Sequence, residues 1–244
     1  MEIVNLTSNH LNKPNLHLQI TTDGISLTKH ASGWQNFEQN LKAYLPWSQI
    51  KGFDQFLIEN QIEKKHISLI NVEICHHLFL LIPMEYHSNL FKMAYLEKAL
   101  GSKEIIGKEV HEQLCQKEEA HFVFLIDSEW KDFIAHHFPL AKIQYEHILA
   151  NLIISHNRFL RTQLNIFLTH QKLAFVVCRK NGKLQIANLF MYQSHTELAF
   201  YIHSIKDAFD LIWSNDLLQI AGIDSQNTTL IESLVELKVP IHLP

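Results

Sequence analysis

Binding of a nucleotide phosphate would need short glycine-rich turns, whose backbone amides converge on the anion, and a carboxylate that holds a divalent ion beside it. The chain contains one partial match, Thr22-Asp23-Gly24, between two segments of alternating apolar and polar residues, and no second glycine or run of serines adjoins it. Asp-Gly in this position is also the strongest short-range signal for a β-hairpin, because glycine accepts the positive φ of a primed turn. We therefore interpret Asp23 and Gly24 first as turn residues.

Seventeen histidines raise the question of a metal site. Two histidines chelate a metal locally when they are four residues apart on a helix or two apart on a strand, because both imidazoles then leave the same face. No pair in this chain has either spacing, and His76-His77 and His136-His137 would each point in two directions. Distant histidines can still converge after folding, but we predict no metal ligand from the sequence.

The three cysteines, Cys75, Cys115 and Cys178, are far apart and lack a CxxC spacing. This pattern argues against a disulfide framework and a zinc knuckle, and favours buried, reduced thiols. A two-metal nuclease is disfavoured as well, because the first predicted strand carries no carboxylate. We predict no catalytic residue. The enzymatic alternative is a hydrolase whose histidine, cysteine or aspartate groups meet only in space, and no linear motif supports it.

The composition excludes further classes of function. The chain has 244 residues, of which 47% are hydrophobic and 19% charged, which suits one large or two small globular domains. A net charge of -4 gives no broad basic surface, so we expect no nucleic-acid partner. Residues 1–15 lack a secretory signal, and the longest apolar run, Leu78–Met84, is far below the ~18 residues of a spanning helix. We expect a cytoplasmic protein without membrane insertion.

The first half of the chain alternates between strand and helix patterns. Period-two alternation predicts strands at 16–20, 25–28, within 34–44, at 67–74 and at 77–83. Ser48 is a candidate N-cap for a short helix, and a second helix runs from about 85 to 100, where Gly101 can end it. Residues 101–120 are charged and weakly periodic, which indicates an insertion or an irregular edge.

The middle of the chain contains a buried-type strand at 121–126 and a short helix capped by Asp127 or Ser128. Apolar residues from Tyr145 to Leu160 keep the helical period over more than four turns, so we predict a long helix there.

The last third has a clearer pattern. We predict strands at 164–169, 172–179 and 183–192, a helix after Ser194, a strand at 217–221, a helix at 227–238 and an edge strand at 239–243. Asn181-Gly182 is a primed-turn pair between two of the strands, and Ser194 with Glu197 forms a capping box.

Three strands followed by helix, strand and helix is the order of a ribonuclease H-like unit, and the chain contains this order twice. It resembles, over nearly its whole length, an uncharacterised bacterial family catalogued only as a domain of unknown function. The resemblance rests on Leu16–Leu27, on Ala120–Ile126 with Phe138-Pro139, and above all on Gly182–Gly222.

This resemblance implies an α/β protein with an actin-like ATPase fold, in which two ribonuclease H-like lobes each have a mixed β-sheet flanked by helices. The domains expected are a polar N-terminal segment at 1–15, a first lobe at 16–160 with an irregular part at 101–120, and a second lobe at 161–244. The family has no assigned activity, so the resemblance predicts a fold without a function.

An actin-like ATPase holds its nucleotide between the lobes, with one strand-turn-strand loop from each. The second-lobe turn, Thr169-His170-Gln171-Lys172, has no aspartate or glycine, although Lys172 could attract an anion. Gly222 is the one glycine left in the turn that would border adenosine. The only candidates for cofactor binding are therefore vestigial: Asp23, Gly24, Lys172 and Gly222. We expect no cofactor and no enzymatic activity.

Two functions remain from this interpretation. The first is a non-catalytic actin-like protein, a pseudo-ATPase with a degenerate nucleotide site, that acts as an interaction scaffold for an unknown protein partner. The alternative is a divergent nucleotide-binding assembly factor that resembles the actin-like components of pilus or secretion machines.

Overall fold

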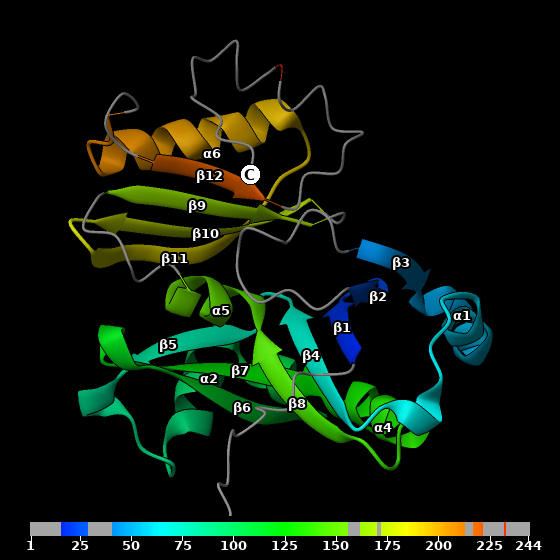
Figure 1. Ribbon diagram of the computed structural model, residues 1–244. Helices are drawn as coiled ribbons and strands as arrows, with labels where there is room; N and C mark the ends of the chain where they lie inside the picture. Colours follow the sequence, from blue (N-terminus) through cyan, green and yellow to red (C-terminus); the bar gives the residue numbers. More distant parts are fainter. Residues whose placement is uncertain are drawn as a thin grey trace, which may run out of the picture.

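The computed structural model describes residues 16–28, 41–155, 162–169, 172–212, 217–221 and 232. Three β-sheets organise these residues (Figure 1). The first sheet has the strand order β3-β2-β1-β4-β8. Its strands are β1 (Leu16–Thr21), β2 (Gly24–Thr28), β3 (Leu41–Pro46), β4 (Leu69–Cys75) and β8 (Lys142–His147). β1, β2 and β3 form an antiparallel meander, whereas β4 and β8 add to β1 in parallel.

The second sheet repeats this plan. Its order is β11-β10-β9-β12, with β9 (Gln163–Leu168), β10 (Leu173–Lys180), β11 (Lys183–Met191) and β12 (Leu217–Ala221). β9 to β11 form the meander, and β12 lies parallel to β9 as β4 lies parallel to β1. Apart from Glu232, which is helical, the residues of the predicted helix at 227–238 and of the strand at 239–243 lie outside the described residues. The shared order of the two sheets is the repeat expected from two ribonuclease H-like units.

A third sheet, β5-β7-β6, lies in the chain between β4 and β8. It consists of β5 (Phe79–Pro83), β6 (Lys108–Cys115) and β7 (Ala120–Asp127), with helices α2 (Lys92–Leu100) and α3 (Ser102–Ile105) and the short 3-10 helices η4 (Met84–Tyr86) and η5 (Gln116–Glu118) between the strands. The expectation of an irregular segment at 101–120 is therefore wrong, because most of it is α3 and β6. The two carboxylates of β6, Glu109 and Glu112, are exposed, and most residues beside them are only partly buried, so the strand has no clear apolar alternation.

Two other expected boundaries change. The segment predicted as a helix from Tyr145 to Leu160 begins as a strand, β8, up to His147, and the helix α5 follows at Ile148–Ser155. Residues 156–160 lie outside the described residues. The spacing of Tyr145, Ile148 and Leu149 matches the period of a helix. The pairing of β8 with β4 nevertheless places Tyr145 opposite Val72 in the sheet. The helix expected after Ser48 begins as a 3-10 turn, η2 (Trp47–Gly52), and becomes α1 only at Phe53–Glu59. A further short 3-10 helix, η3 (Lys64–His66), precedes β4.

Several local predictions are confirmed. Asn181 and Gly182 both have positive φ, as a primed turn requires. Helix α4 (Ser128–His137) has Asp127 as its N-cap, and helix α6 (His195–Ala208) has Ser194. Ser194 Oγ accepts from the Glu197 amide at 3.2 Å, while the Glu197 carboxylate accepts from the Gln193 amide at 2.7 Å.

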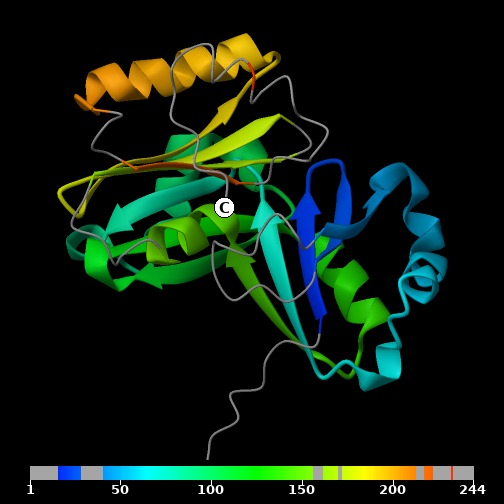
Figure 2. The same ribbon diagram turned by 45° about the horizontal axis from the view of Figure 1, so that its top comes forward.

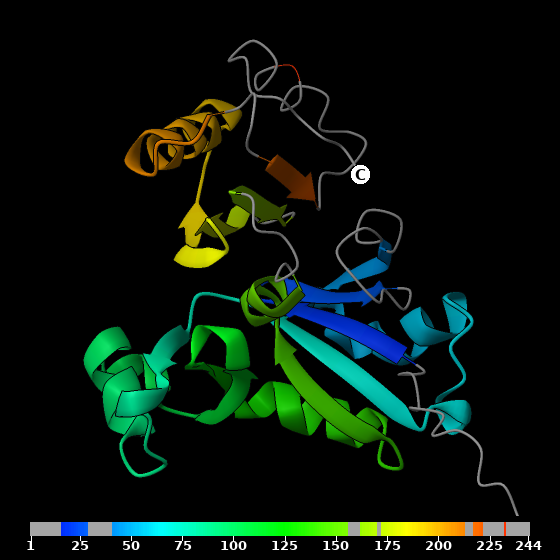
Figure 3. The same ribbon diagram turned by 60° about the vertical axis from the view of Figure 1, so that its left-hand side comes forward.

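Helix α5 lies between the first and second sheets (Figures 1 and 2). The largest cluster of buried apolar side chains joins all three, since it includes Leu18 and Ile74 of the first sheet, Leu149 and Ile153 of α5, and Phe175 of the second sheet. Helix α4 covers the opposite face of the first sheet, and α6 covers the outer face of the second (Figure 3). The region between the two large sheets is therefore a packed layer over the described residues.

No helix among the described residues has both the length and the apolar character to cross a bilayer.

Candidate functional site

The turn between β1 and β2 is where the first vestigial candidates lie. The Thr21 hydroxyl is 2.6 Å from Asp23 Oδ1 and 3.0 Å from the carbonyl oxygen of Gly24. Trp47 donates twice to the same turn, from its amide to the Asp23 carbonyl at 2.9 Å and from Nε1 to the Thr21 carbonyl at 3.0 Å. The polar groups of this turn are thus bonded to one another and to the start of η2.

Strand β3 also packs directly on this turn. A Cβ atom at Gly24 would lie 2.5 Å from the carbonyl oxygen of Leu45 and 2.6 Å from the Tyr44 ring. Burial and the neighbouring Asp23 carboxylate, to which the Tyr44 hydroxyl is hydrogen-bonded, raise the pKa of Tyr44 to about 12. Gly24 is therefore needed for the close approach of β3, which is a packing role.

The second-lobe turn holds Lys172 in a left-handed conformation with φ 59. Its Nζ donates to the carbonyl oxygen of Gln193 at 2.7 Å, and its amide donates to Thr169 at 3.1 Å. Lys172 is thus engaged within its own lobe, as Asp23 is within the first. His170, Gln171 and Gly222 lie outside the described residues.

A buried row of polar side chains, which the sequence did not indicate, crosses the first sheet beneath α5. Gln19, Glu73 and Glu146 lie in register on the adjacent strands β1, β4 and β8. Gln19 Nε2 donates to Glu73 at 3.0 Å, and Asn151 of α5 donates to Glu73 at 3.0 Å and to Glu146 at 3.1 Å. The signal in the sequence is a glutamate in strand β4, whose other residues are apolar except Asn71.

Glu73 is the electrostatic centre of this row. Its side chain is fully buried, and burial raises its pKa, against the opposing effects of His17, Asn151 and Gln19. A buried carboxyl with a raised pKa is a typical general acid or base. Here, however, both carboxylate oxygens accept from side-chain amides. Because the hydrogen-bond partners of Glu73 come from β1 and α5, this row of polar side chains connects helix α5 to the first sheet.

A second buried charge connects the two lobes. Arg179 of β10 is 1% exposed, and its guanidinium donates to Glu118 of η5 at 2.6 Å and to the carbonyl oxygen of Ile153 in α5 at 2.7 Å. Arg179 therefore joins the second sheet to both α5 and the third sheet.

Two buried imidazoles connect the first and third sheets. His76 Nδ1 accepts from the Leu78 amide at 3.1 Å, so its Nε2 carries the hydrogen and donates to the Leu125 carbonyl at 2.7 Å. His147 is bonded in the same way, to the Leu149 amide and the His76 carbonyl. Burial lowers the pKa of His76 to about 4 and that of His147 well below its usual value. Both imidazoles are neutral structural groups.

The cysteines are not arranged for nucleophilic chemistry. Cys75, Cys115 and Cys178 are all free and buried, as the sequence indicated. Burial raises the pKa of the Cys75 thiol well above its usual value and that of Cys115 to about 11. A thiolate is the reactive form, so burial suppresses the reactivity of these two groups.

A surface hollow of about 560 Å³ is formed by α1 and η3, with Asp54, Leu57, Ile62 and Lys64 in its wall. Among the described residues, neither the β1–β2 turn nor the β9–β10 turn lines this hollow.

Comparison with known proteins identifies the fold. Residues 4–237 match the model of a family described as "Protein of unknown function (DUF3822)". Among curated proteins, none matches the chain. A solved protein of Bacteroides thetaiotaomicron, with an actin-like ATPase fold and unknown function, superposes with a TM-score of 0.68 at 15% identity, over 95% of this chain and 91% of that one. A PilM-PilN type IV pilus biogenesis complex gives a TM-score of 0.57 at 11% identity, over 94% and 87%.

At these identities the similarity establishes the fold and leaves the activity open. The predicted fold class is confirmed: the chain has the actin-like ATPase fold. Because the family model spans nearly all of the sequence, the chain belongs to the family described as "Protein of unknown function (DUF3822)".

Proposed function

We propose that this protein is a non-catalytic member of the actin-like fold that acts as an interaction scaffold. The observation that supports this proposal most directly is the β1–β2 turn. In an actin-like ATPase this turn would face phosphate, but here Thr21, Asp23 and Trp47 are bonded to one another. Tyr44 fills the space beside Gly24.

The packing between the lobes supports the same proposal. Nucleotide-dependent function in this fold relies on a cleft between two lobes. Here α5 occupies the layer between the large sheets, and Arg179 binds both α5 and η5 across it. A movement that separated the two large sheets would remove the buried partners from the Arg179 guanidinium. Such a nucleotide-driven movement would therefore cost free energy.

A partner-binding role fits one exposed segment. Five large apolar side chains are exposed between residues 84 and 93: Met84, Tyr86, Leu90, Phe91 and Met93. Exposed apolar patches of this kind often mark protein contacts. The solved structure that superposes with a TM-score of 0.57 is itself described as a PilM-PilN complex. We therefore infer that a protein with an apolar binding surface docks on residues 84–93.

Isothermal titration of the full chain with ATP and Mg²⁺, together with a hydrolysis assay, tests the loss of nucleotide function. We expect no binding in the micromolar range and no turnover above background. Micromolar affinity or measurable hydrolysis would overturn the proposal. Asp23→Ala serves as the matched variant, and we expect it to change stability slightly and nucleotide binding not at all.

Site-specific photo-crosslinking in the native host tests the docking segment. A crosslinker at Phe91 should capture a defined protein, whereas one at Lys183, at the exposed start of β11, should not. The same product from both positions, or capture that persists after Leu90→Glu, would count against the segment.

The second candidate is a divergent nucleotide-binding assembly factor. The whole-length similarity to the pilus biogenesis complex favours it. It predicts that Gly222→Arg weakens nucleotide binding without unfolding the chain. If the wild-type protein binds no nucleotide, this candidate is excluded at the first step.

A further inference from the structure

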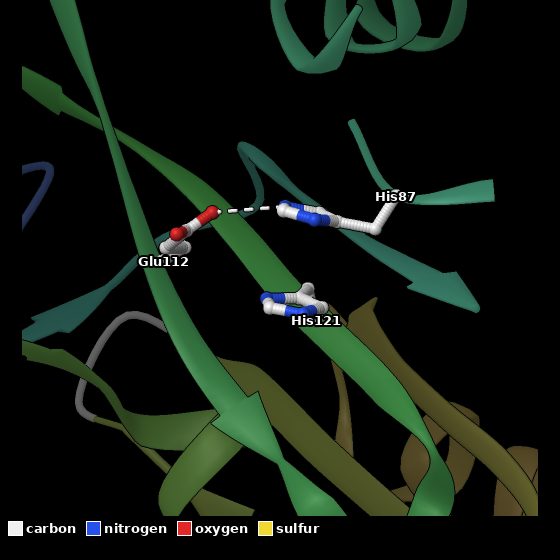
Figure 4. Close-up of side chains that lie close together, drawn as sticks. All are labelled: His87, Glu112 and His121. Carbon is white, nitrogen blue, oxygen red and sulfur yellow. Dashed lines mark hydrogen bonds and ion pairs between the residues drawn. The ribbon is translucent and has the colours of Figure 1, made fainter. Parts of the chain in front are cut away.

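Three side chains with metal-binding chemistry lie close together at the third sheet (Figure 4). They are His87, which follows η4, Glu112 of β6 and His121 of β7. In the β6–β7 register Glu112 lies opposite Val123, so His121 is its diagonal neighbour on the same face of the sheet. The possible ligand atoms of the three residues all lie within 4.8 Å of one another.

We propose that His87, Glu112 and His121 form a binding site for a zinc-type divalent ion. Two imidazoles and one carboxylate, with a fourth position left for water, form a ligand set that Zn²⁺ adopts in proteins. His87 Nε2 is 3.1 Å from Glu112 Oε2. Two ligands of a tetrahedral zinc ion are separated by ~3.3 Å, given zinc–nitrogen and zinc–oxygen bonds of about 2.0 Å. This pair therefore already has nearly the required spacing.

His121 supplies an uncommitted nitrogen to the group. Its Nδ1 is buried and forms no hydrogen bond to any part of the chain that the structure describes. Its ring lies on that of His87, with centroids 3.6 Å apart and planes 10° from parallel. The nitrogen lone pairs lie in the ring planes, so those of two stacked rings do not converge on one point. Coordination of a single ion by both imidazoles therefore requires the rings to rotate out of this stack. Metal binding should therefore change the environment of both rings.

Lys92 is the cation that would compete with a metal ion for the Glu112 carboxylate. Its Nζ lies 3.4 Å from the same Glu112 oxygen and 3.2 Å from Asn89 Oδ1. A metal ion would displace the ammonium group from Glu112, while Asn89 could retain it. The alternative interpretation is an ordinary surface ion-pair cluster of His87, Glu112 and Lys92. The two interpretations differ in the effect of removing Lys92, because loss of this charge favours a metal site and weakens an ion-pair cluster.

Titration of the EDTA-treated full chain with ZnCl₂, followed by calorimetry, tests the proposal. We expect one tight site per chain for Zn²⁺ and no comparable site for Mg²⁺, which prefers oxygen ligands. His87→Gln, Glu112→Gln and His121→Gln should each weaken binding by more than the ~10–100-fold that loss of an outer-shell partner costs. Co²⁺ in place of zinc should show the visible absorption of a tetrahedral site, and His87→Gln should abolish it.

Two further variants make the result specific. Lys92→Met should tighten zinc binding by roughly two- to fivefold, because an exposed ion pair of ordinary strength no longer opposes it. His66→Gln is the control, since its imidazole is 68% exposed and far from the group in sequence. The proposal is overturned if the wild type binds no zinc at micromolar concentration. It is equally overturned if binding is unchanged in His87→Gln and His121→Gln variants that retain the circular dichroism of the wild type, because the zinc would then be on other histidines.

Discussion

The two buried ionisable side chains beside α5, Glu73 and Arg179, have hydrogen-bond partners of different kinds. Glu73 accepts hydrogen bonds from Gln19 and Asn151, both neutral amides of the first lobe or of α5 itself. Arg179 donates to a carboxylate and a backbone carbonyl that belong to other layers. The first arrangement holds one sheet to its helix, whereas the second holds the second sheet to the rest of the molecule. A buried ionisable side chain can thus hold one sheet to its helix or join separate layers of the molecule, depending on which elements carry its hydrogen-bond partners.

Removal of Arg179 should have the largest effect. Arg179→Met leaves the largely buried Glu118 carboxylate and the Ile153 carbonyl without their partner, and breaking a buried ion pair typically costs about 3–5 kcal/mol. Urea denaturation should show this loss. The matched control is the neighbouring Lys180→Met, whose exposed pair with Asp210 should contribute ~0–1 kcal/mol.

A double variant sharpens this result. Arg179→Met with Glu118→Gln removes both charges, so it should lose less stability than Arg179→Met alone. If the double variant is the less stable of the two, the uncompensated carboxylate is not the source of the effect.

Acidification should destabilise the first lobe through His76. The pKa of His76 is about 4 in the folded chain and near 6.5 in the unfolded chain. The unfolded state therefore binds more protons between these values. The contribution of His76 is complete above pH 6.5 and falls as the pH drops from 6.5 towards 4, by about 3 kcal/mol in total. His147 adds to the loss in the same direction.

Urea denaturation at a series of pH values measures this dependence. His76→Asn keeps an acceptor for the Leu78 amide and should flatten the curve between pH 6.5 and 4. His77→Gln, at the neighbouring exposed position, should leave it steep. Equal slopes for the two variants would remove His76 as the cause.

Two substitutions at Glu73 test whether the row below α5 is a local structural network. Glu73→Leu leaves the buried Gln19 amide without its acceptor, at about 1–3 kcal/mol, and removes one of the two acceptors of Asn151, which keeps Glu146. Glu73→Gln should cost much less, because the Gln19 amide can turn over and accept from the new side chain.

The sign of the pH effect at Glu73 is opposite to that at His76. Burial raises the pKa of Glu73 in the folded state, so its contribution is complete below about pH 4.5 and is lost as the pH rises through the raised value. Glu73→Gln should therefore gain stability relative to wild type as the pH rises, measured by urea denaturation. A Gln variant as unstable as the Leu variant would indicate that the carboxylate itself is required.

Local patterns predicted much of the fold. The hairpin between β1 and β2, the turn at Asn181-Gly182 and the capping box at Ser194 each depend on a few neighbouring residues, so the sequence contains the necessary information. The primed turn expected at Asp23-Gly24 is wrong, however, because Gly24 is the first residue of β2 and neither residue has a positive φ. The boundary at His147 was not predictable, because Tyr145 fits a helical period and a strand alternation equally well. Its state is decided by pairing with Val72, which is far away in the chain.

The candidate sites depend even more on distant pairing. Gln19, Glu73 and Glu146 meet only because three parallel strands align at one level. His87 and His121 are likewise far apart, and no local spacing rule for chelation detects them. The expectation that no metal is bound was based on such rules, and the zinc titration now tests it. The lobe boundaries at 1–15, 16–160 and 161–244 stay predictions.

The smallest expected effect concerns the closed β1–β2 turn, the contact on which the proposed function rests. Gly24→Ala places a methyl group 2.5 Å from the Leu45 carbonyl oxygen, which belongs to the backbone and cannot rotate away. We expect a loss of about 1–3 kcal/mol in urea denaturation. Gly52→Ala is the control, because its Cβ would have no neighbour within 4 Å and its φ of -86 suits alanine. If the two variants are equally stable, β3 does not pack closely on the turn in solution, and the packing at Gly24 no longer supports the proposed function.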